Sequence, residues 1–159
     1  MGDFVVYWTS LFIPLVVLLP NLLWLLFPPV NRPQAEETDV PVSLTLLERA
    51  GQSGVTIFPL FYPVVLDDAA SLVYVTAMLL LLAVYYTGWL RFFQRGRDHA
   101  LLFLPLWGIP IPMAISPVLY FILAAGVLKS IPMLLAAFSL AIGHLATSHK
   151  EFCRITRNQ

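Results

Sequence analysis

The stretch AASLVYVTAMLLLLAVYYTGWLRF, residues 69–92, decides the fold class of this chain. It carries no charged side chain before Arg91, and it is longer than the ~20 apolar residues with which a helix crosses ~30 Å of hydrocarbon. The whole chain has the same character, because 59% of its 159 residues are hydrophobic and only 11% are charged. Soluble domains carry roughly 25% charged residues. The sequence therefore predicts an all-α integral membrane protein.

Four more apolar segments flank this stretch, and together they predict a single transmembrane domain of five helices over residues 1–159. Two segments precede it, at 5–27 and 46–66, and two follow it, at 111–128 and 131–148. Residues 28–45 are rich in proline and acidic side chains and have no helical period, so we expect a loop there. Residues 93–100, FQRGRDHA, form a second, basic loop.

The positions of Lys and Arg orient the predicted helices. If the N-terminus is outside and the C-terminus is cytoplasmic, eight of the nine cations lie inside, and only Lys129 lies outside. Those eight are Arg32, Arg49, Arg91, Arg95, Arg97, Lys150, Arg154 and Arg157. The positive-inside rule favours this arrangement. We therefore expect both loops in the cytoplasm and the protein in a cell membrane, the inner membrane of a bacterium.

A proline-broken segment precedes the fourth predicted helix. The stretch LPLWGIPIPMAISP, residues 104–117, contains four prolines. We expect irregular chain over residues 105–111, a short turn capped by Asp98 before it, a helix start at Pro112, and a bend at Pro117. Irregular backbone at membrane depth must be buried in protein or line a wet cavity, as in transporters. Alternatively, the segment lies in the headgroup zone, where water satisfies it.

Polar residues from distant parts of the sequence fall at similar depths. At 1.5 Å per residue, Asn21 and Gln52 lie ~9 Å, His144 ~6 Å and Glu48 ~3 Å inside the cytoplasmic ends of their helices. Tyr86 lies at a comparable depth, and the broken segment enters from the same side. We therefore predict a ligand-binding site with an opening to the cytoplasm, formed by Asn21, Glu48, Gln52, Tyr86, Gly108 and His144.

Each of these positions also has a structural alternative. Asn21 follows Pro20 and would satisfy carbonyls that the proline frees. Glu48 suits the start of a helix, where the dipole favours negative charge. His144 serves either as a structural hydrogen-bonding residue or as a proton shuttle or ligand-binding group. For the basic loop, we expect contacts to anionic lipid headgroups from Arg91, Arg95 and Arg97.

Small residues mark two helix faces. They are Ala136, Ser139, Gly143 and Ala146 in the fifth predicted helix and Ala50 and Gly54 in the second. Small side chains let helices approach closely in lipid, so these faces predict packing within the bundle, with dimerisation as the alternative.

Three stretches carry a resemblance: PNLLWLLFPP (20–29), LLERAGQ (46–52) and RGRDHALLFLPLWGIPIPMAISPVLYF (95–121). They resemble a family of small bacterial polytopic membrane proteins that are uncharacterised, so this resemblance implies no activity. In size and number of helices the chain is also similar to the translocator protein family, whose five helices surround a lipophilic ligand. It lacks that family's tryptophan-and-proline motif in the first loop, so this similarity concerns architecture alone.

Two functions fit these features. The first is a noncatalytic binding or accessory (scaffold) protein with a polar pocket facing the cytoplasm, whose partners are membrane lipids, a lipophilic ligand or a larger membrane complex. The second is a small transporter or channel that acts as a homo-oligomer, with its site at the broken fourth helix. An enzyme ranks third, because Glu48 and His144 would have to perform acid–base chemistry without an evident nucleophile.

Other classes of function lack a signal. No Cys/His spacing resembles a zinc site, and no glycine-rich phosphate loop is present, so we predict no metal, no cofactor and no catalytic residue. The net charge of zero gives no reason to expect a nucleic-acid partner.

Overall fold

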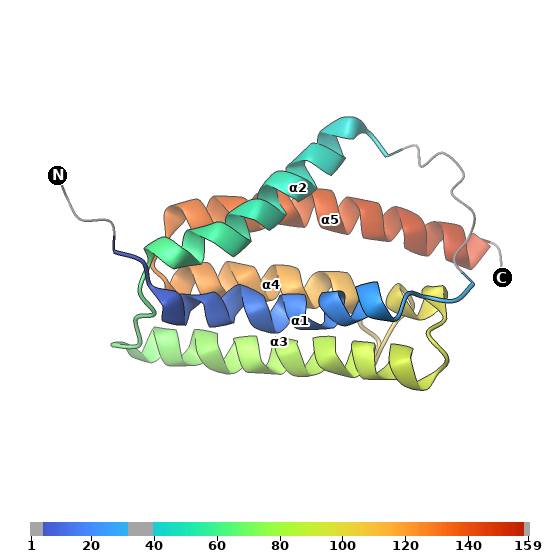
Figure 1. Ribbon diagram of the computed structural model, residues 1–159, viewed down its shortest axis with the longest axis horizontal. Helices are drawn as coiled ribbons and strands as arrows, with labels where there is room; N and C mark the ends of the chain where they lie inside the picture. Colours follow the sequence, from blue (N-terminus) through green and yellow to red (C-terminus); the bar gives the residue numbers. More distant parts are fainter. Residues whose placement is uncertain (1–4, 32–39, 158–159) are drawn as a thin grey trace.

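The computed structural model describes residues 5–31 and 40–157, and within these ranges all regular structure is helical (Figure 1). The five α-helices are α1 (Phe12–Leu26), α2 (Val42–Ile57), α3 (Ala69–Gln94), α4 (Pro112–Val127) and α5 (Ile131–Arg157). Three short 3-10 helices accompany them, namely η1 (Trp8–Leu11), η2 (Phe58–Phe61) and η3 (His99–Leu102). The all-α prediction is confirmed.

The helices alternate in direction along one common axis. In Figure 1, α1, α3 and α5 run from one end of the bundle to the other, and α2 and α4 return. Helix α4 packs between α3 and α5, and α2 packs along α5. The N-terminal half of α2 diverges from the bundle, and α1 makes few contacts, chiefly with α3 and α4. The structure is therefore a tight core of α3, α4 and α5 with two peripheral helices.

Among the described residues, three helices are long and apolar enough to cross a membrane, where five were predicted. They are Trp8–Leu26, with mean hydropathy 2.1, Ala69–Gln94, with 2.0, and Ile131–Arg157, with 1.6. Helix α4 is apolar but has only 16 residues. Helix α2 also has 16 residues and is less apolar, because it includes Glu48, Arg49 and Gln52.

The predicted segment 46–66 is wrong at both ends. Helix α2 begins four residues earlier, at Val42, so the predicted loop 28–45 is too long; within it, residues 32–39 lie outside the described part of the chain. The helical chain ends at Phe61, and Tyr62 is extended with φ −132° and ψ 131°. Pro63 accounts for this ending, because a proline disfavours the helical conformation of the residue before it.

Other boundaries also differ. Residues 5–7 of the first predicted helix are not helical. Helix α3 extends to Gln94 and η3 begins at His99, which shortens the predicted loop 93–100. Helix α5 continues beyond the predicted end at 148 to Arg157. No glycine or proline follows Gly143 to stop it, and the Arg154 guanidinium donates to the Glu151 carboxylate one turn away.

The proline-broken segment has the predicted conformation. Residues 105–111 are not helical, and α4 begins at Pro112 with Pro117 in its interior. The Asp98 carboxylate caps η3 by accepting from the Ala100 amide at 3.0 Å. Leu106 and Ile109 exchange two backbone hydrogen bonds, which closes a tight turn. Its two central residues, Trp107 and Gly108, have φ of 52° and 79°.

Glycines bring α2 and α5 into close contact. A Cβ added at Gly143 would lie 2.5 Å from the Glu48 backbone nitrogen, and one at Gly54 would lie 2.5 Å from the Ala136 Cβ. The predicted packing role of Gly54, Ala136 and Gly143 is therefore confirmed. Ser139, by contrast, faces outward and bonds only within α5, to the Leu135 carbonyl.

Tyrosine hydroxyls fasten α1 to the core. Tyr85 and Tyr86 of α3 donate to the carbonyls of Val17, at 3.2 Å, and Val16, at 2.6 Å, and Tyr120 of α4 donates to the Ile13 carbonyl at 3.1 Å. Pro20 has no N–H to pair with the Val16 carbonyl, so Tyr86 replaces the missing donor. Helix α1 is thus attached mainly at one side and leaves its other side open.

Candidate functional site

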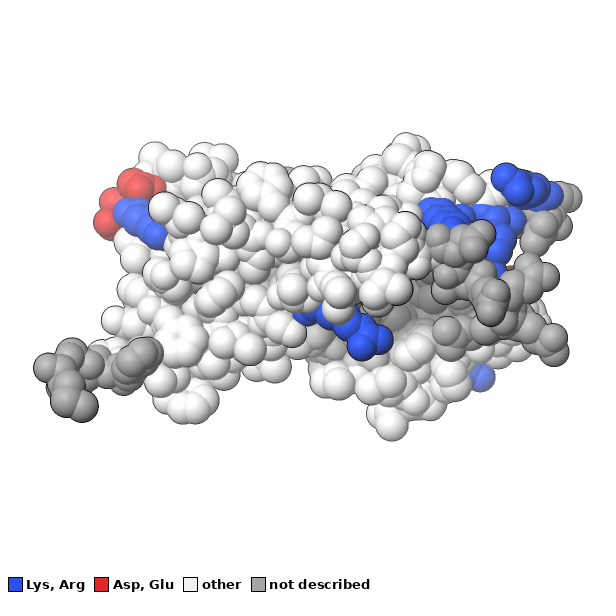
Figure 2. All heavy atoms as spheres, turned by 90° about the horizontal axis from the view of Figure 1, so that it is seen from above, with Lys and Arg blue, Asp and Glu red and all other residues white. Residues whose placement is uncertain are grey.

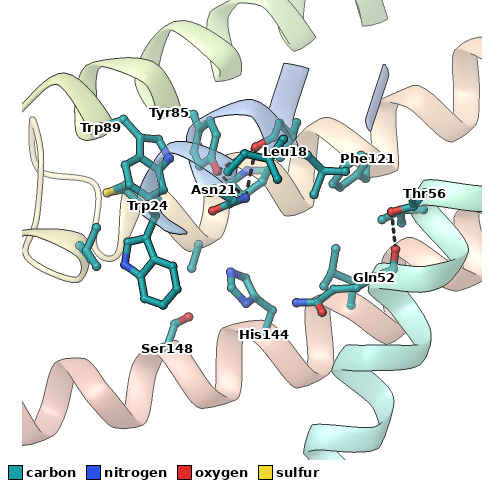
Figure 3. A pocket seen from close by; sticks show the side chains of 18 of the residues that line it. Leu18, Asn21, Trp24, Gln52, Thr56, Tyr85, Trp89, Phe121, His144 and Ser148 are labelled. Atoms are coloured by element: carbon teal, nitrogen blue, oxygen red, sulfur yellow. Dashed lines mark hydrogen bonds between the residues drawn. The ribbon is translucent and has the colours of Figure 1, made fainter. Parts of the chain in front are cut away.

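A cavity of about 700 Å³ lies between α1 and the α2–α5 pair. Figure 3 shows it in close-up, with side chains from all five helices around it. Its size falls within the range of ligand pockets in proteins, ≈ 300–1,000 Å³. It exists because α2 packs along α5 while α1 is held on α3 and α4, so the two peripheral helices do not close against each other.

The wall of the cavity is mostly apolar. Helix α1 contributes Leu15, Leu18, Leu22 and Leu25, which recur at the spacing of one helical face. Opposite them lie the side chains of Val55, Met113, Phe121 and Leu140. Leu15, Leu22 and Leu25 are also among the exposed large hydrophobic side chains. The cavity is therefore open along the α1 side, where an apolar molecule would enter from the surface of the bundle.

One polar group on the wall comes from α1 and α3. The Asn21 amide nitrogen lies 3.2 Å from the Val17 carbonyl and 3.3 Å from the Tyr85 hydroxyl, which itself donates to the same carbonyl. These bonds fix the Asn21 side chain and use its donors. Beside them, the Trp89 side chain lines the cavity, and its Nε1 is buried without a hydrogen-bond acceptor at good geometry.

A second polar group comes from α2 and α5. His144 Nδ1 lies 2.7 Å from Glu48 Oε1, and the Thr147 hydroxyl donates to Glu48 Oε2 at 3.2 Å. The Glu48 side chain is 18% exposed and that of His144 is 29% exposed. Because an ionised carboxylate can only accept, the His144 Nδ1 carries the shared hydrogen. The imidazole is thereby held in one orientation, and Figure 3 shows it pointing into the cavity.

The structure brings four of the six predicted site residues together. Asn21, Gln52 and His144 line the cavity, and Glu48 is bonded to His144. Tyr86 is not part of the lining, because its hydroxyl is bonded to the Val16 carbonyl. Gly108 does not line the cavity either, and it lies in the turn closed by Leu106 and Ile109. The cavity does include Met113, Ala114 and Pro117 of the broken fourth helix, so a transport site at this helix stays a prediction.

The three predicted lipid-contact residues lie at the end of α3 and just after it. The Arg91 guanidinium donates to the Pro105 carbonyl at 2.8 Å, so it also supports the proline-broken segment. The Arg97 carbonyl accepts from the Val30 amide, at 2.8 Å, and thereby joins the end of α1 to this loop. The Arg95 side chain is exposed. Contact of these side chains with lipid stays a prediction.

Several lining residues escaped the sequence analysis, among them Trp24, Thr56, Tyr85, Trp89 and Ser148. Four of them stand one turn from another lining residue, since Thr56 follows Gln52, Ser148 follows His144, and Trp89 follows Tyr85 at i, i+4. This spacing places both residues of each pair on one helix face. A search for such polar or aromatic pairs along the predicted helices would have found them.

The comparisons add no relative. No protein-family model, no curated protein and no solved structure matches this chain. The resemblance of residues 20–29, 46–52 and 95–121 to a family of small bacterial membrane proteins therefore stays a prediction. What the chain has in common with known binding proteins is physical: a preformed, mostly apolar cavity with a few polar groups at fixed positions.

Proposed function

We propose that this chain is an integral membrane protein that binds a lipophilic small molecule in the cavity between α1 and the α2–α5 pair, without changing it chemically. The observation that carries the proposal is the cavity of about 700 Å³, with its leucine-rich side and its few oriented polar groups. Such a cavity buries an apolar ligand and leaves specificity to a small number of hydrogen bonds.

Five membrane crossings follow if the three long apolar helices cross. Because α1, α3 and α5 run in the same direction, the chain must return between them, and only α2 and α4 are available to carry it back (Figure 1). At 1.5 Å per residue, 16 residues span ~24 Å, a little less than the ~30 Å hydrocarbon layer. Irregular chain at both ends of α4 completes its crossing.

The charge distribution supports an orientation. Figure 2 shows basic groups concentrated toward one end of the bundle, and acidic groups beside a basic one at the other end. Arg91 lies in the last turn of α3, and Arg154 and Arg157 lie in the last turn of α5. The positive-inside rule would place this end in the cytoplasm, in keeping with an inner membrane of a bacterium. The cavity then lies nearer the cytoplasmic side.

Binding is favoured over catalysis by the state of the candidate catalytic groups. His144 is paired to Glu48 through Nδ1, which resembles the orienting half of a catalytic triad. Among the described residues, no hydroxyl or thiol that could act as a nucleophile is hydrogen-bonded to the other ring nitrogen of His144, Nε2. The pair therefore acts as a fixed polar contact in the cavity wall.

Tryptophan fluorescence provides the test. The chain has four tryptophans, of which Trp24 and Trp89 line the cavity, while Trp8 and Trp107 are each 70% exposed. A Trp8→Phe/Trp107→Phe variant in lipid nanodiscs would report on the cavity alone. We expect methyl dibromostearate, whose bromine atoms quench tryptophan on contact, to quench it saturably.

Two matched variants separate cavity binding from partition into the bilayer. Thr56 and Thr76 each donate to the carbonyl four residues earlier, but only Thr56 lines the cavity. Thr56→Phe should fill part of the cavity and weaken binding by about tenfold, the equivalent of ~1.4 kcal/mol. Thr76→Phe should leave binding unchanged. Quenching that rises without saturation, and equally in both variants, would contradict the proposal.

A further inference from the structure

We infer that the ligand is an uncharged lipophilic molecule whose polar end carries a hydrogen-bond-accepting oxygen, such as an ester or ketone carbonyl. This inference rests on the proposed function, because it specifies the chemistry of the ligand for the same cavity.

Unused hydrogen-bond donors face the cavity. The residue Trp89 is 6% exposed, and its Nε1, which can only donate, makes no hydrogen bond of full geometry. Among the described residues, the acceptor that it approaches is the Tyr85 hydroxyl, which already donates to the Val17 carbonyl and accepts from Asn21. Figure 3 shows its ring on the cavity wall beside Tyr85 and near Asn21. The donors of these two neighbours are already used, because the Asn21 amide donates to the Tyr85 hydroxyl and the Val17 carbonyl, and Tyr85 donates to the same carbonyl. A buried donor without a partner is costly, so an acceptor on the ligand would restore a missing bond.

Gln52 adds a second unused donor. Its side chain lines the cavity, is exposed rather than buried, and makes no hydrogen bond to a described residue, while its backbone carbonyl accepts from Thr56. In Figure 3 the amide projects into the cavity on the same side as His144. Donors therefore reach the cavity from two walls, one from α3 and one from α2.

The cavity offers no unbalanced positive charge for an anionic headgroup. No Lys or Arg of the described part of the chain lines it, and each of its two histidines faces a carboxylate. His144 lies 2.7 Å from Glu48, and His99 lies 3.8 Å from Glu151. A carboxylate or phosphate inside would lose its hydration without gaining an unpaired cation, which costs much free energy.

A cationic headgroup is disfavoured for the opposite reason. Among residues 5–31 and 40–157, the acidic side chains near the wall are Glu48 and Glu151, and neither is part of the lining. Both are already engaged, Glu48 by His144 and Thr147 and Glu151 by Arg154. The remaining solution is a neutral ligand that lays its chain along the α1 leucines and directs a carbonyl oxygen toward Trp89 or Gln52.

Three probes with the same brominated chain test this chemistry. In the Trp8→Phe/Trp107→Phe background, methyl dibromostearate, dibromostearate and dibromooctadecane are compared in nanodiscs at alkaline pH, where the acid is ionised. We expect the ester to bind about fivefold more tightly than the hydrocarbon, as one additional neutral hydrogen bond implies. We expect the carboxylate to bind more weakly than the ester.

Variants identify the donors. Trp89→Phe keeps an aromatic ring among Tyr85, Phe92 and Phe93 and leaves Trp24 as the reporter. It should reduce the preference for ester over hydrocarbon, and Gln52→Leu provides an independent check if Trp89→Phe does not fold. The inference would be overturned if the carboxylate probe bound most tightly of the three, or if both variants kept the same preference for ester over hydrocarbon. Either result would still leave a binding cavity. Saturable quenching by none of the three probes would overturn the proposed function as well.

Discussion

At the scale of single residues, proline and tyrosine act together in α1. Pro20 leaves the Val16 carbonyl without its helical donor, and the Tyr86 hydroxyl reaches it at 2.6 Å from a neighbouring helix. In lipid no water is present to satisfy such a carbonyl. Pro20 of α1 is therefore accommodated by Tyr86 of α3. The same hydrogen bond holds the Tyr86 hydroxyl away from the cavity wall.

The first prediction is that Tyr86→Phe costs ~1–2 kcal/mol of the free energy of unfolding, because it leaves the Val16 carbonyl unpaired. In a Pro20→Ala background, the restored amide of residue 20 pairs with that carbonyl, so the same change should cost much less. Unfolding in mixed micelles, followed by circular dichroism in a double-mutant cycle, measures the coupling. An equal cost in both backgrounds would show that Tyr86 has no such role.

The site was predictable from the sequence only in part, and the reason lies in helix rotation. Asn21, Gln52 and His144 were predicted from depth alone, and they do line one cavity. Depth cannot distinguish Tyr85 from Tyr86, which differ by ~100° around α3. Because α3 is apolar on all sides, no amphipathic pattern sets its rotation. The packing of α3 on α4, together with the hydrogen bonds to α1, decides that Tyr85 faces the cavity.

At the scale of elements, the α2–α5 contact depends on the absence of side-chain carbon. A Cβ added at Gly51 or Gly143 would collide with the backbone of the facing helix, and one added at Gly54 would collide with Ala136. The close approach also brings Glu48 within bonding distance of His144 and Thr147. Packing of these two helices thus builds one of the polar groups in the cavity.

The second prediction follows from that contact. Gly143→Val should destabilise the protein by ~1–3 kcal/mol or more, since its Cβ would lie 2.5 Å from the Glu48 backbone nitrogen. Ser139→Val on the outward face of the same helix should have little effect. The midpoint of thermal unfolding in detergent compares the two. Equal midpoints would mean that α2 and α5 do not pack as described.

A charged cluster joins two turns at one end of the bundle. Asp68 caps α3 by accepting from the Ser71 amide at 2.7 Å, and Lys129 Nζ lies 2.8 Å from Asp67 and 3.5 Å from Asp68. The bond from the Ser71 backbone holds the pKa of Asp68 below its usual 3.8. The bond to Asp67 raises the pKa of Lys129 above its usual 10.5.

The third prediction is a dependence of stability on pH with two arms. A lowered carboxyl pKa adds stability above its usual value, and this stability is lost as the pH falls through the lowered pKa of Asp68. A raised amine pKa adds stability below its usual value, and this is lost as the pH rises through the raised pKa of Lys129. Thermal midpoints in detergent should show a plateau between them.

Substitutions assign the two arms of that profile. Asp68→Asn should flatten the acidic arm, and Lys129→Met should flatten the alkaline arm while keeping the bond between Asp68 and Ser71. Both groups are exposed, so the effects should be small and should weaken in high salt. An acidic arm that is unchanged in Asp68→Asn would assign it to another group.

Element boundaries were predictable where hydropathy and turn chemistry agree. Helices α3 and α4 start within one residue of the predicted positions, at Asp68–Ala69 and at Pro112. The end of α2 was missed because the apolar run continues through Val64, Val65 and Leu66, whereas the helix stops before Pro63. Hydropathy reports burial in lipid or protein, and it does not distinguish a helix from extended chain.

At the scale of the whole molecule, the directions of the helices say more about which of them cross the membrane than their lengths do. Helices α2 and α4 are too short or too polar to be recognised as crossings on their own. In the proposed topology they are crossings, because α1, α3 and α5 run in parallel and the chain must return between them (Figure 1). Under that proposal the opening of the cavity on the α1 side would face the bilayer, and a lipophilic ligand would reach it laterally without passing through water.

The fourth prediction tests this topology with reporter fusions. Fusions after Asn31 and Arg97 should both report the cytoplasm, because these positions follow α1 and α3 at the basic end of the bundle. Fusions after Asp68 and Lys129 should report the outside, since these residues belong to the charged cluster at the other end. Cytoplasmic signals from all four positions would mean that α1, α3 and α5 do not cross. A reversed pattern would keep five crossings but would invert the molecule, and would place the cavity nearer the outer surface.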